Sequence, residues 1–271
     1  MNKSQITIDI DSKYKFIYTH LIYPDNITDC MYEPFESGYP IILDNYKIKN
    51  FNYDYFYEFP FWFTEKNEWE KPWYPSDIKK GTPMQYVAID NDIFLKEHKS
   101  AFIAWDQFYK ACFPDYKAKN KTLSHRYNQL IVNKLHLDLL DADHTGYDQQ
   151  MRMFLNLDTK KPRILAFSYT VEQLFVIFYN KKNLYQLDKS NVNKFISELR
   201  DRCIWNDEKN DFFTLPRHYI TLNPGAIWIF NSQWISHQII FGNKLQCFEV
   251  DIEPFSLHQP NKSISNIIKN L

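Results

Sequence analysis

The sequence predicts a mainly β protein with flanking helices, and three observations favour this fold class. Short runs of apolar or alternating residues follow one another from residue 126 to residue 252, as expected for strands. Longer stretches with helical spacing lie before these runs and between them. The sequence shows no internal repeat and no linker. We therefore expect a double-stranded β-helix (jelly-roll, cupin-like) core with helices packed around it.

Length and composition favour one globular domain. The chain has 271 residues, of which 44% are hydrophobic and 24% are charged. We expect a single domain over residues 1–271, in which an N-terminal extension of about residues 1–92 packs on a core formed by residues 93–260. The net charge of −1 argues against a nucleic-acid-binding protein, which normally carries a basic excess.

The sequence also predicts where the protein resides. Its four cysteines are widely spaced and form no Cys-x-x-Cys pair, which indicates reduced thiols. The N-terminus has no apolar signal region, and no apolar run approaches the ~20 residues of a membrane span. We expect a cytoplasmic protein without a transmembrane span. Peripheral contact at the inner face of the membrane is a further expectation.

The predicted N-terminal extension is rich in aromatic residues and proline. Residues 38–44 predict a strand and its turn. The apolar segment 59–63 is expected in the core, with pocket lining or contact with a lipid surface as alternatives. Residues 64–83 combine prolines, tryptophans and charges, and we expect a loop there that acts as a lid.

The predicted core begins with a helix and continues as strands. Apolar residues recur at intervals of three and four from about residue 93 to residue 113, and Pro114 ends this helix. Thr170 is placed to cap a second helix, and further helices are expected at 191–204 and 264–268. Strands are expected at 126–132, 135–140, 151–158, 164–169, 219–222, 226–230, 234–240 and 245–252.

The stretch 135–139 carries the strongest chemical signal. His136 and Asp138 alternate with leucines, so on a strand both polar side chains project from one face. A third ligand is offered by His237, on a late strand-like run that follows a Pro-Gly turn. Two imidazoles and one carboxylate on one face form the facial site of non-haem Fe(II) oxygenases. We therefore predict that His136, Asp138 and His237 bind Fe(II) and carry the catalysis.

Other interpretations of these residues stay open. Either His136 or His237 can be a structural histidine, and a nearby acidic cluster can imitate a metal site. That cluster consists of Asp141, Asp143 and His144. The remaining candidates for the third ligand, each less well placed, are His125, His218 and His258.

Enzymes with such a site usually consume 2-oxoglutarate, whose distal carboxylate requires a fixed cation. Arg152 alternates with apolar residues on a predicted strand, where a buried cation needs an anion. Its alternative role is a salt bridge with Asp158 or Glu249. Asn156, on the same face, either hydrogen-bonds the cosubstrate or satisfies a backbone group. Lys244 lies in a Gly-Asn-Lys turn and is expected in solvent.

Several segments, taken in order, resemble the Kdo hydroxylases, which are Fe(II)/2-oxoglutarate oxygenases that hydroxylate the 3-deoxy-D-manno-octulosonic acid of lipopolysaccharide. The matching segments lie at 113–116, 124–126, 136–138, 151–156, 162–163, 224–230 and 236–238, with Gly242 beyond them.

The resemblance implies that His136, Asp138 and His237 hold iron and that Arg152 binds the far carboxylate of 2-oxoglutarate. It places Arg126 near the cosubstrate or the acceptor, and a surface position is the alternative for this residue. Tyr127 stands where the family tends to have proline. The segments that serve the acceptor in the family have no counterpart here.

The sequence thus predicts a dioxygenase that uses Fe(II), 2-oxoglutarate and O2 to hydroxylate an aliphatic C–H bond. An intact Asp138 favours hydroxylation over halogenation, because halogenases leave that coordination position to chloride. The expected partner is a small-molecule or glycolipid substrate, with a Kdo-type sugar first. The alternatives are the same chemistry on a small molecule, amino acid or peptide, and a non-catalytic jelly-roll binding protein.

Overall fold

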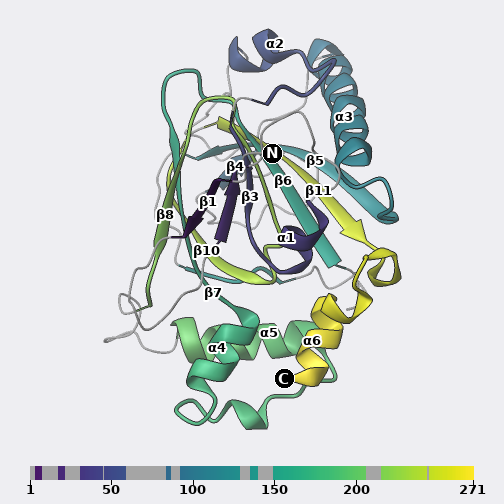
Figure 1. Ribbon diagram of the computed structural model, residues 1–271. Coiled ribbons are helices and arrows are strands. Elements are labelled where there is room, and N and C mark those ends of the chain that lie inside the picture. The colour runs from purple at the N-terminus through teal and green to yellow at the C-terminus, as the bar shows by residue number, and fades with distance from the viewer. Residues whose placement is uncertain are drawn as a thin grey trace.

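The strands of the chain form two sheets that face each other (Figure 1). The structure is a computed structural model, and it describes residues 4–7, 18–21, 31–44, 46–58, 84–86, 92–128, 135–139, 149–205, 215–242 and 244–271. The larger sheet has the order β1-β2-β3-β9-β6-β11-β5-β4, and the smaller sheet has the order β10-β7-β8. All pairs are antiparallel except β2 with β3.

The strands of the larger sheet are β1 (Ser4–Thr7), β2 (Tyr18–Leu21), β3 (Ile41–Leu43), β9 (Ile227–Phe230), β6 (Gln149–Asn156), β11 (Lys244–Ile252), β5 (Ala118–Asn128) and β4 (Met84–Tyr86). Those of the smaller sheet are β10 (Ile235–Phe241), β7 (Arg163–Thr170) and β8 (His218–Leu222).

Strand β6 is buried on both faces and separates two apolar clusters. Met151, Met153 and Leu155 belong to the cluster on the outer side of the larger sheet, under the first helices. Phe154 belongs to the cluster between the sheets, and Arg152 shares its face of the strand. The alternation predicted for this strand is confirmed, and it directs the arginine toward the interior of the sandwich.

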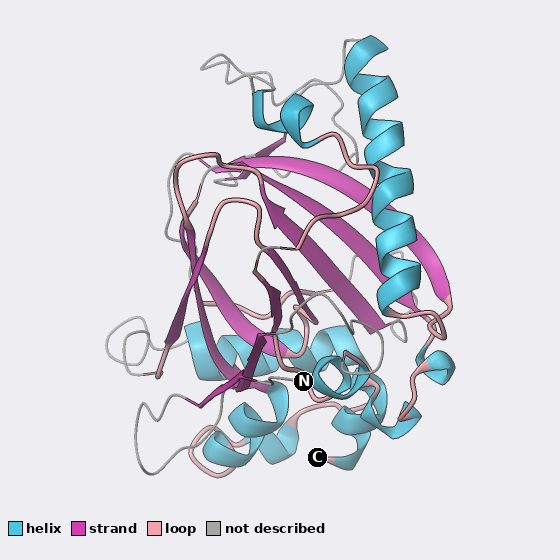
Figure 2. Ribbon diagram, turned by 45° about the horizontal axis from the view of Figure 1, so that its top comes forward, coloured by secondary structure: helices cyan, strands magenta, loops and turns pink. Residues whose placement is uncertain are grey.

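Helix α3 (Asp92–Cys112) lies along the outer face of the larger sheet, as Figure 2 shows. Its apolar side is buried, and the ring of Trp105 stacks on Phe248 of β11 with centroids 5.8 Å apart. The short helices α1 (Tyr32–Glu36) and α2 (Tyr53–Glu58) contribute to the same cluster. The helix predicted at 93–113 is therefore confirmed.

A chain of buried polar side chains fastens α3 to the larger sheet. Trp105 Nε1 donates to Gln246 Oε1 at 2.9 Å, which leaves Gln246 Nε2 to donate to His125 Nδ1 at 3.1 Å. His125 must then carry its proton on Nε2, which donates to His98 Nδ1 at 2.9 Å. Burial, and then the neighbouring His98, lower the pKa of His125 well below its ordinary value, and burial lowers the pKa of His98.

The remaining helices gather at the other end of the molecule (Figure 1). Thr170 caps α4 through a capping box. Its hydroxyl accepts a hydrogen bond from the backbone N–H of Gln173, and the side chain of Gln173 accepts one from the backbone N–H of Thr170. Asn191 and Ser263 cap the other two helices. These elements are α4 (Val171–Phe178), the 3₁₀ turn η3 (Leu184–Gln186), α5 (Val192–Arg200), the π-helical turn η4 (Asp201–Trp205), the 3₁₀ turns η5 (Pro254–Ser256) and η6 (Pro260–Lys262), and α6 (Ile264–Asn270).

Three predicted elements differ in detail from the structure. Strand β5 begins at Ala118, eight residues before the predicted 126, because its polar first half pairs with β11. The stretch 135–139 is extended but pairs only through one isolated bridge, at His136. The helix predicted over 191–204 is α5 followed by η4.

Some predictions fall outside the described ranges. Segments 59–63 and 64–83 belong to this group, so their predicted roles stay predictions. The division into an extension and a core also stays a prediction. No helix within the described ranges is long and apolar enough to cross a bilayer.

Candidate metal centre

The segment 135–139 attaches to the free edge of β10 through the two predicted histidine ligands. The backbone N–H of His136 donates to the carbonyl of His237 at 3.0 Å, and His237 returns the bond at 2.9 Å. Asp138 N–H then donates to the carbonyl of Ser232 at 3.0 Å. The side chains of Leu135 and Leu137 are fully buried on the opposite side. This apolar anchor turns His136 and Asp138 toward His237, as the alternation predicted.

The side chains of these residues converge on one point. His136 Nε2 lies 3.5 Å from Asp138 Oδ1, and His237 Nε2 lies 3.7 Å from Asp138 Oδ2. One ligand atom from each residue lies within 4.8 Å of the others. Donors around an octahedral first-row ion with bonds of about 2.1 Å lie about 3 Å apart, so a small inward movement suffices. Elsewhere in the described ranges, no three histidine, cysteine or carboxylate side chains meet in this way.

The protonation states suit metal binding. His237 Nδ1 lies 3.1 Å from the carbonyl of Ile235, and since a carbonyl only accepts, this nitrogen carries the proton and Nε2 keeps its lone pair. Burial and His136 lower the pKa of His237 to about 3. Burial alone would raise the pKa of Asp138, but Arg152 and the two histidines outweigh it and lower that pKa. The neutral imidazole of His237 and the ionised carboxylate of Asp138 match the donors of a facial Fe(II) site.

Arg152 lies directly behind this group. Its Nη1 is 2.5 Å from Asp138 Oδ2, and its Nε is 3.5 Å from Glu249 Oε1 on β11. Arg126 Nη2 contacts the same Glu249 oxygen, while Arg126 Nε donates to Ser124 Oγ at 3.0 Å. The salt bridge between Arg152 and Glu249, which the sequence offered as an alternative, is therefore present. Arg126 is buried, in contrast to its alternative placement at the surface.

One cavity between the sheets joins the three predicted ligands to three arginines. Its wall consists of Arg126, His136, Asp138, Arg152, Phe154, Arg163, Leu165, Trp228, Phe230, His237, Ile239 and Leu245. The ring of Phe230 meets the imidazole of His237 edge-on at 5.0 Å, so aromatic side chains shield the polar groups from water.

Arg163 is the member of this cavity that sequence reasoning missed as a site residue. It is fully buried at the start of β7, and its guanidinium carbon lies 5.8 Å from the ring of Trp228. Burial, and then the positive charge of Arg126, lower the pKa of Arg163 to about 9 against the opposing effect of Asp158. The available signal was an arginine that opens an otherwise apolar strand, since such a cation must meet an anion or a cavity.

Asn156 does not join the cavity wall, and this corrects its predicted role toward the cosubstrate. Its Nδ2 donates to the carbonyls of Leu222 and Asn223 at 3.2 Å each, and its Oδ1 accepts from the backbone N–H of Asp158 at 3.1 Å. The side chain is fully buried within these bonds. Asn156 therefore satisfies backbone groups after β8, which was its alternative role.

The other histidines named as candidates lie elsewhere. His125 belongs to the polar chain under α3, and His258 Nε2 lies 3.0 Å from Asp115 Oδ2. His218 pairs with Phe167 at one end of β8 and is absent from the cavity wall. The cluster at 141–144 lies outside the described residues.

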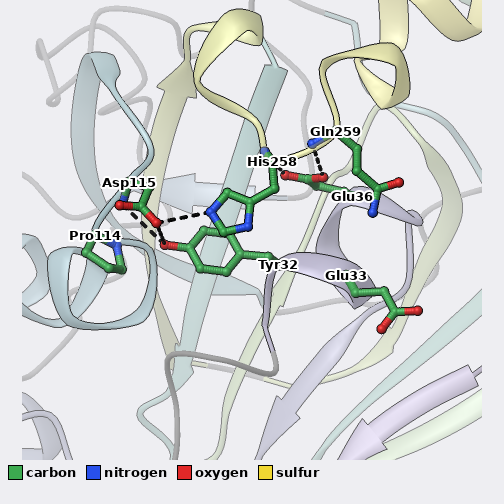
Figure 3. Close-up of a pocket in the computed structure, with 7 residues that line it drawn as sticks. All are labelled: Tyr32, Glu33, Glu36, Pro114, Asp115, His258 and Gln259. Atoms are coloured by element: carbon green, nitrogen blue, oxygen red, sulfur yellow. Dashed lines mark hydrogen bonds and ion pairs between the residues drawn. The ribbon is translucent and has the colours of Figure 1, made fainter.

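A second pocket, of about 310 Å³, lies where the C-terminal tail meets α1 (Figure 3). The ring of His258 stacks on that of Tyr32 at 3.7 Å. Glu36 accepts hydrogen bonds from the Tyr116 hydroxyl at 2.7 Å and from the backbone N–H groups of His258 and Gln259 at 2.7 and 2.9 Å. Its carboxylate is occupied in holding the tail, so we assign this pocket a structural role.

Comparison with solved structures identifies a shared fold. The chain superimposes on the Kdo hydroxylase KdoO, a non-heme Fe(II) alphaketoglutarate dependent dioxygenase, in complex with alphaketoglutarate and Fe(III). That match has a TM-score of 0.61, 16% identity, and coverage of 92% of this chain and 95% of that chain. The apo structure of KdoO matches with a TM-score of 0.61 and 15% identity, again over 92% and 95% of the two chains. The complex of KdoO with cobalt(II) matches with a TM-score of 0.59 and 15% identity, over 92% and 95%.

Sequence comparison adds little to this result. No protein-family model matches the chain. The MATH and LRR domain-containing protein PFE0570w of Plasmodium falciparum (isolate 3D7) is 26% identical over 131 residues, which is 47% of this chain and 1% of that protein. The chain therefore spans a very small part of the curated relative that it matches. At identities this low the structural likeness establishes the fold, and the predicted fold class is confirmed.

Proposed function

We propose that the protein is an Fe(II)/2-oxoglutarate-dependent dioxygenase that hydroxylates an aliphatic C–H bond. The observation that carries this proposal is the convergence of His136, Asp138 and His237 on one point at the wall of a cavity rich in arginine. The fold shared with KdoO structures that contain Fe(III) and alphaketoglutarate supports it. In this proposal the two imidazoles and the carboxylate hold Fe(II), and the cavity receives 2-oxoglutarate.

The bound Fe(II) would supply the activation of O2, coupled to oxidation of 2-oxoglutarate to succinate and CO2. The chain's own residues prepare the site for this chemistry. The Ile235 carbonyl fixes the tautomer of His237, and Arg152 keeps Asp138 ionised and oriented. Phe154 and Phe230 stack with centroids 5.6 Å apart and form part of the cavity wall. Arg126 and Arg152 are predicted to contact the cosubstrate, and their burial beside the ligands supports this.

The test is oxygen-dependent release of succinate from 2-oxoglutarate by protein loaded anaerobically with Fe(II). We expect His136→Ala to lose metal affinity and succinate release by more than about 100-fold. Removal of a metal ligand weakens metal binding more than removal of a residue that only hydrogen-bonds a ligand. His258→Ala, which lies in the second pocket and is absent from the cavity wall, is the matched control and should keep both. Undiminished release by His136→Ala would contradict the proposal. Tightly held tetrahedral zinc with no response to 2-oxoglutarate would favour a binding protein.

We propose a Kdo-type sugar of lipopolysaccharide as the first acceptor to test, and the support is the fold shared with the Kdo hydroxylase KdoO. A small molecule, an amino acid or a peptide is the alternative. Succinate release above the uncoupled background should be compared between inner-core lipopolysaccharide and a panel of metabolites. A stimulation confined to the metabolites would reject the glycolipid and leave the dioxygenase assignment intact.

A glycolipid acceptor would agree with cytoplasmic residence and peripheral contact with a membrane, and exposed side chains on α4 and η3 support such a contact. Val176 of α4 and Tyr185 of η3 are 72% and 55% exposed, and Lys181 Nζ lies 5.8 Å from the ring of Phe178 at the end of α4. Apolar and basic side chains on one surface suit an interfacial site. Co-sedimentation with phosphatidylglycerol vesicles tests this: Val176→Asp should reduce binding, whereas Tyr219→Asp on β8 should not. Equal binding by all three proteins would contradict it.

A further inference from the structure

We propose that Ser232 positions Asp138 for metal binding by holding both its main chain and its carboxylate. This inference rests on the proposed function, in which Asp138 is a ligand of the ion. Ser232 lies in the turn between β9 and β10, and its side chain is fully buried. The observations that carry the inference are the strand register, the two bonds to Asp138 and the rigidity of the turn.

The register of the larger sheet places Ser232 among the residues that surround Asp138. Phe230 of β9 pairs with Arg152 of β6. Two residues further along each antiparallel strand, Ser232 stands opposite Gln150, and the period of two keeps these side chains on the interior face. The distance of 3.5 Å between Ser232 Oγ and Gln150 Oε1 agrees with this placement. The hydroxyl therefore points to the side of the sheet on which the metal ligands lie.

Ser232 holds Asp138 at two points. Its carbonyl accepts from the backbone N–H of Asp138 at 3.0 Å, and its hydroxyl hydrogen-bonds the carboxylate of Asp138. The oxygen of Gln150 lies at the outer limit of hydrogen-bond length and already accepts from Arg152 Nε at 3.1 Å. The hydroxyl proton therefore goes to the ionised carboxylate, which is the stronger acceptor.

The turn that carries Ser232 is fixed by bonds that do not involve the metal ligands. Asn231 Oδ1 accepts from the backbone N–H of Gln233 at 3.0 Å, and the Asn231 carbonyl accepts from the N–H of Trp234 at 3.1 Å. The carbonyl of Trp234 accepts from the N–H of Val171 at 2.9 Å, which ties the turn to the start of α4. A donor on such a support can hold a ligand in its binding geometry before the ion arrives.

Two donors thus fix the carboxylate of Asp138: Ser232 from the turn, and Arg152, whose Nη1 lies 2.5 Å from Oδ2. A carboxylate held in this way does not turn freely about its Cβ–Cγ bond and offers the ion one oxygen instead of two. Asp138 then uses a single coordination position, so three of the six positions stay open. Ser232 acts on the ion only through Asp138 and is therefore a positioning residue.

The experiment measures Mn(II) binding by isothermal titration calorimetry, and ligand geometry by the visible absorption spectrum of the protein loaded with Co(II). Ser232→Ala removes the hydroxyl but keeps the main-chain bond to Asp138. We expect it to weaken Mn(II) binding about 10-fold, as for loss of an outer partner of a ligand, and to change the Co(II) spectrum. Ser168→Ala is the matched control, because Ser168 is equally buried on β7 and is absent from the cavity wall. It should bind Mn(II) like the wild-type protein and keep its spectrum.

A third variant separates the hydrogen bond from packing. Ser232→Thr restores a hydroxyl and should bind Mn(II) more tightly than Ser232→Ala. The inference is overturned if Ser232→Ala keeps the wild-type affinity and spectrum, if Ser168→Ala shares its loss, or if Ser232→Thr recovers nothing. Each of these results leaves the dioxygenase assignment intact. If the wild-type protein binds neither Mn(II) nor Co(II), the proposed function itself fails.

Discussion

Individual residues around the candidate metal centre are held by buried partners. The carbonyl of Ile235 sets the proton on His237, and Arg152 neutralises Asp138 from behind. Glu249 lies between Arg152 and Arg126, and these two arginines lower its pKa although burial alone would raise it. A single substitution here changes the charge balance of the whole group. We therefore expect the effects of neighbouring substitutions on stability to be non-additive.

Gly38 gives a prediction about stability at the same scale. Its φ is +77°, and a Cβ there would lie 1.5 Å from Cδ1 of the buried Trp234. We expect Gly38→Ala to lower the free energy of unfolding by about 3 kcal/mol, because backbone strain and overpacking act together. Gly225→Ala is the matched control: its φ is +79°, but the nearest atom, Tyr57 Oη, is 3.1 Å away. Urea denaturation measures both variants, and equal losses would refute the steric argument.

Among the elements, α4 depends on its first turn. It is a short helix that begins directly at the end of β7, and Thr170 belongs to the strand while it caps the helix. The capping box therefore fixes the angle at which the helical layer leaves the smaller sheet.

Removal of this cap should be measurable. We expect Thr170→Ala to reduce the free energy of unfolding by about 1 kcal/mol, since the backbone N–H of Gln173 loses the hydroxyl that accepts its hydrogen bond. Thr170→Ser keeps the hydroxyl and should stay within about 0.5 kcal/mol of the wild-type protein. Thermal or urea unfolding gives the comparison, and a serine variant as unstable as the alanine variant would show that the methyl group matters instead.

At the scale of the whole molecule, the buried chain from Trp105 through Gln246 and His125 to His98 makes stability depend on pH. Both histidines have lowered pKa values in the folded protein, so the unfolded chain binds more protons as the pH falls below about 6.5. Stability should therefore be complete above about pH 7 and decrease toward pH 5, by up to about 1.4 kcal/mol per pH unit for each histidine.

The variant His98→Gln removes one of these titrating groups. We expect its stability to vary less steeply between pH 7 and pH 5 than that of the wild-type protein, as measured by urea unfolding at several pH values. The carboxylates with lowered pKa values lose their contribution only at more acidic pH, and His218 and His237, whose pKa values are also lowered, contribute equally to both proteins and cancel in the comparison. An unchanged slope in the variant would contradict the assignment to this chain.

Much of this architecture could be predicted from the sequence, because its signals are periodic. Burial on both faces of β6 and on one side of α3 leaves direct patterns, and the leucines flanking His136 indicated which way the ligands face. The polar start of β5 left no such pattern, since its pairing with β11 overrides weak local preference. Which arginines meet at the cavity depends on how the two sheets face each other, and no local pattern records that arrangement.

The main-chain bonds between His136 and His237 have one more consequence. They align the two positions through backbone atoms, which every amino acid other than proline can provide. The scaffold thus tolerates a change of side chain at either position, and new donor sets become accessible by single substitutions. The backbone alignment of the two segments can therefore persist when the donor atoms at these positions change.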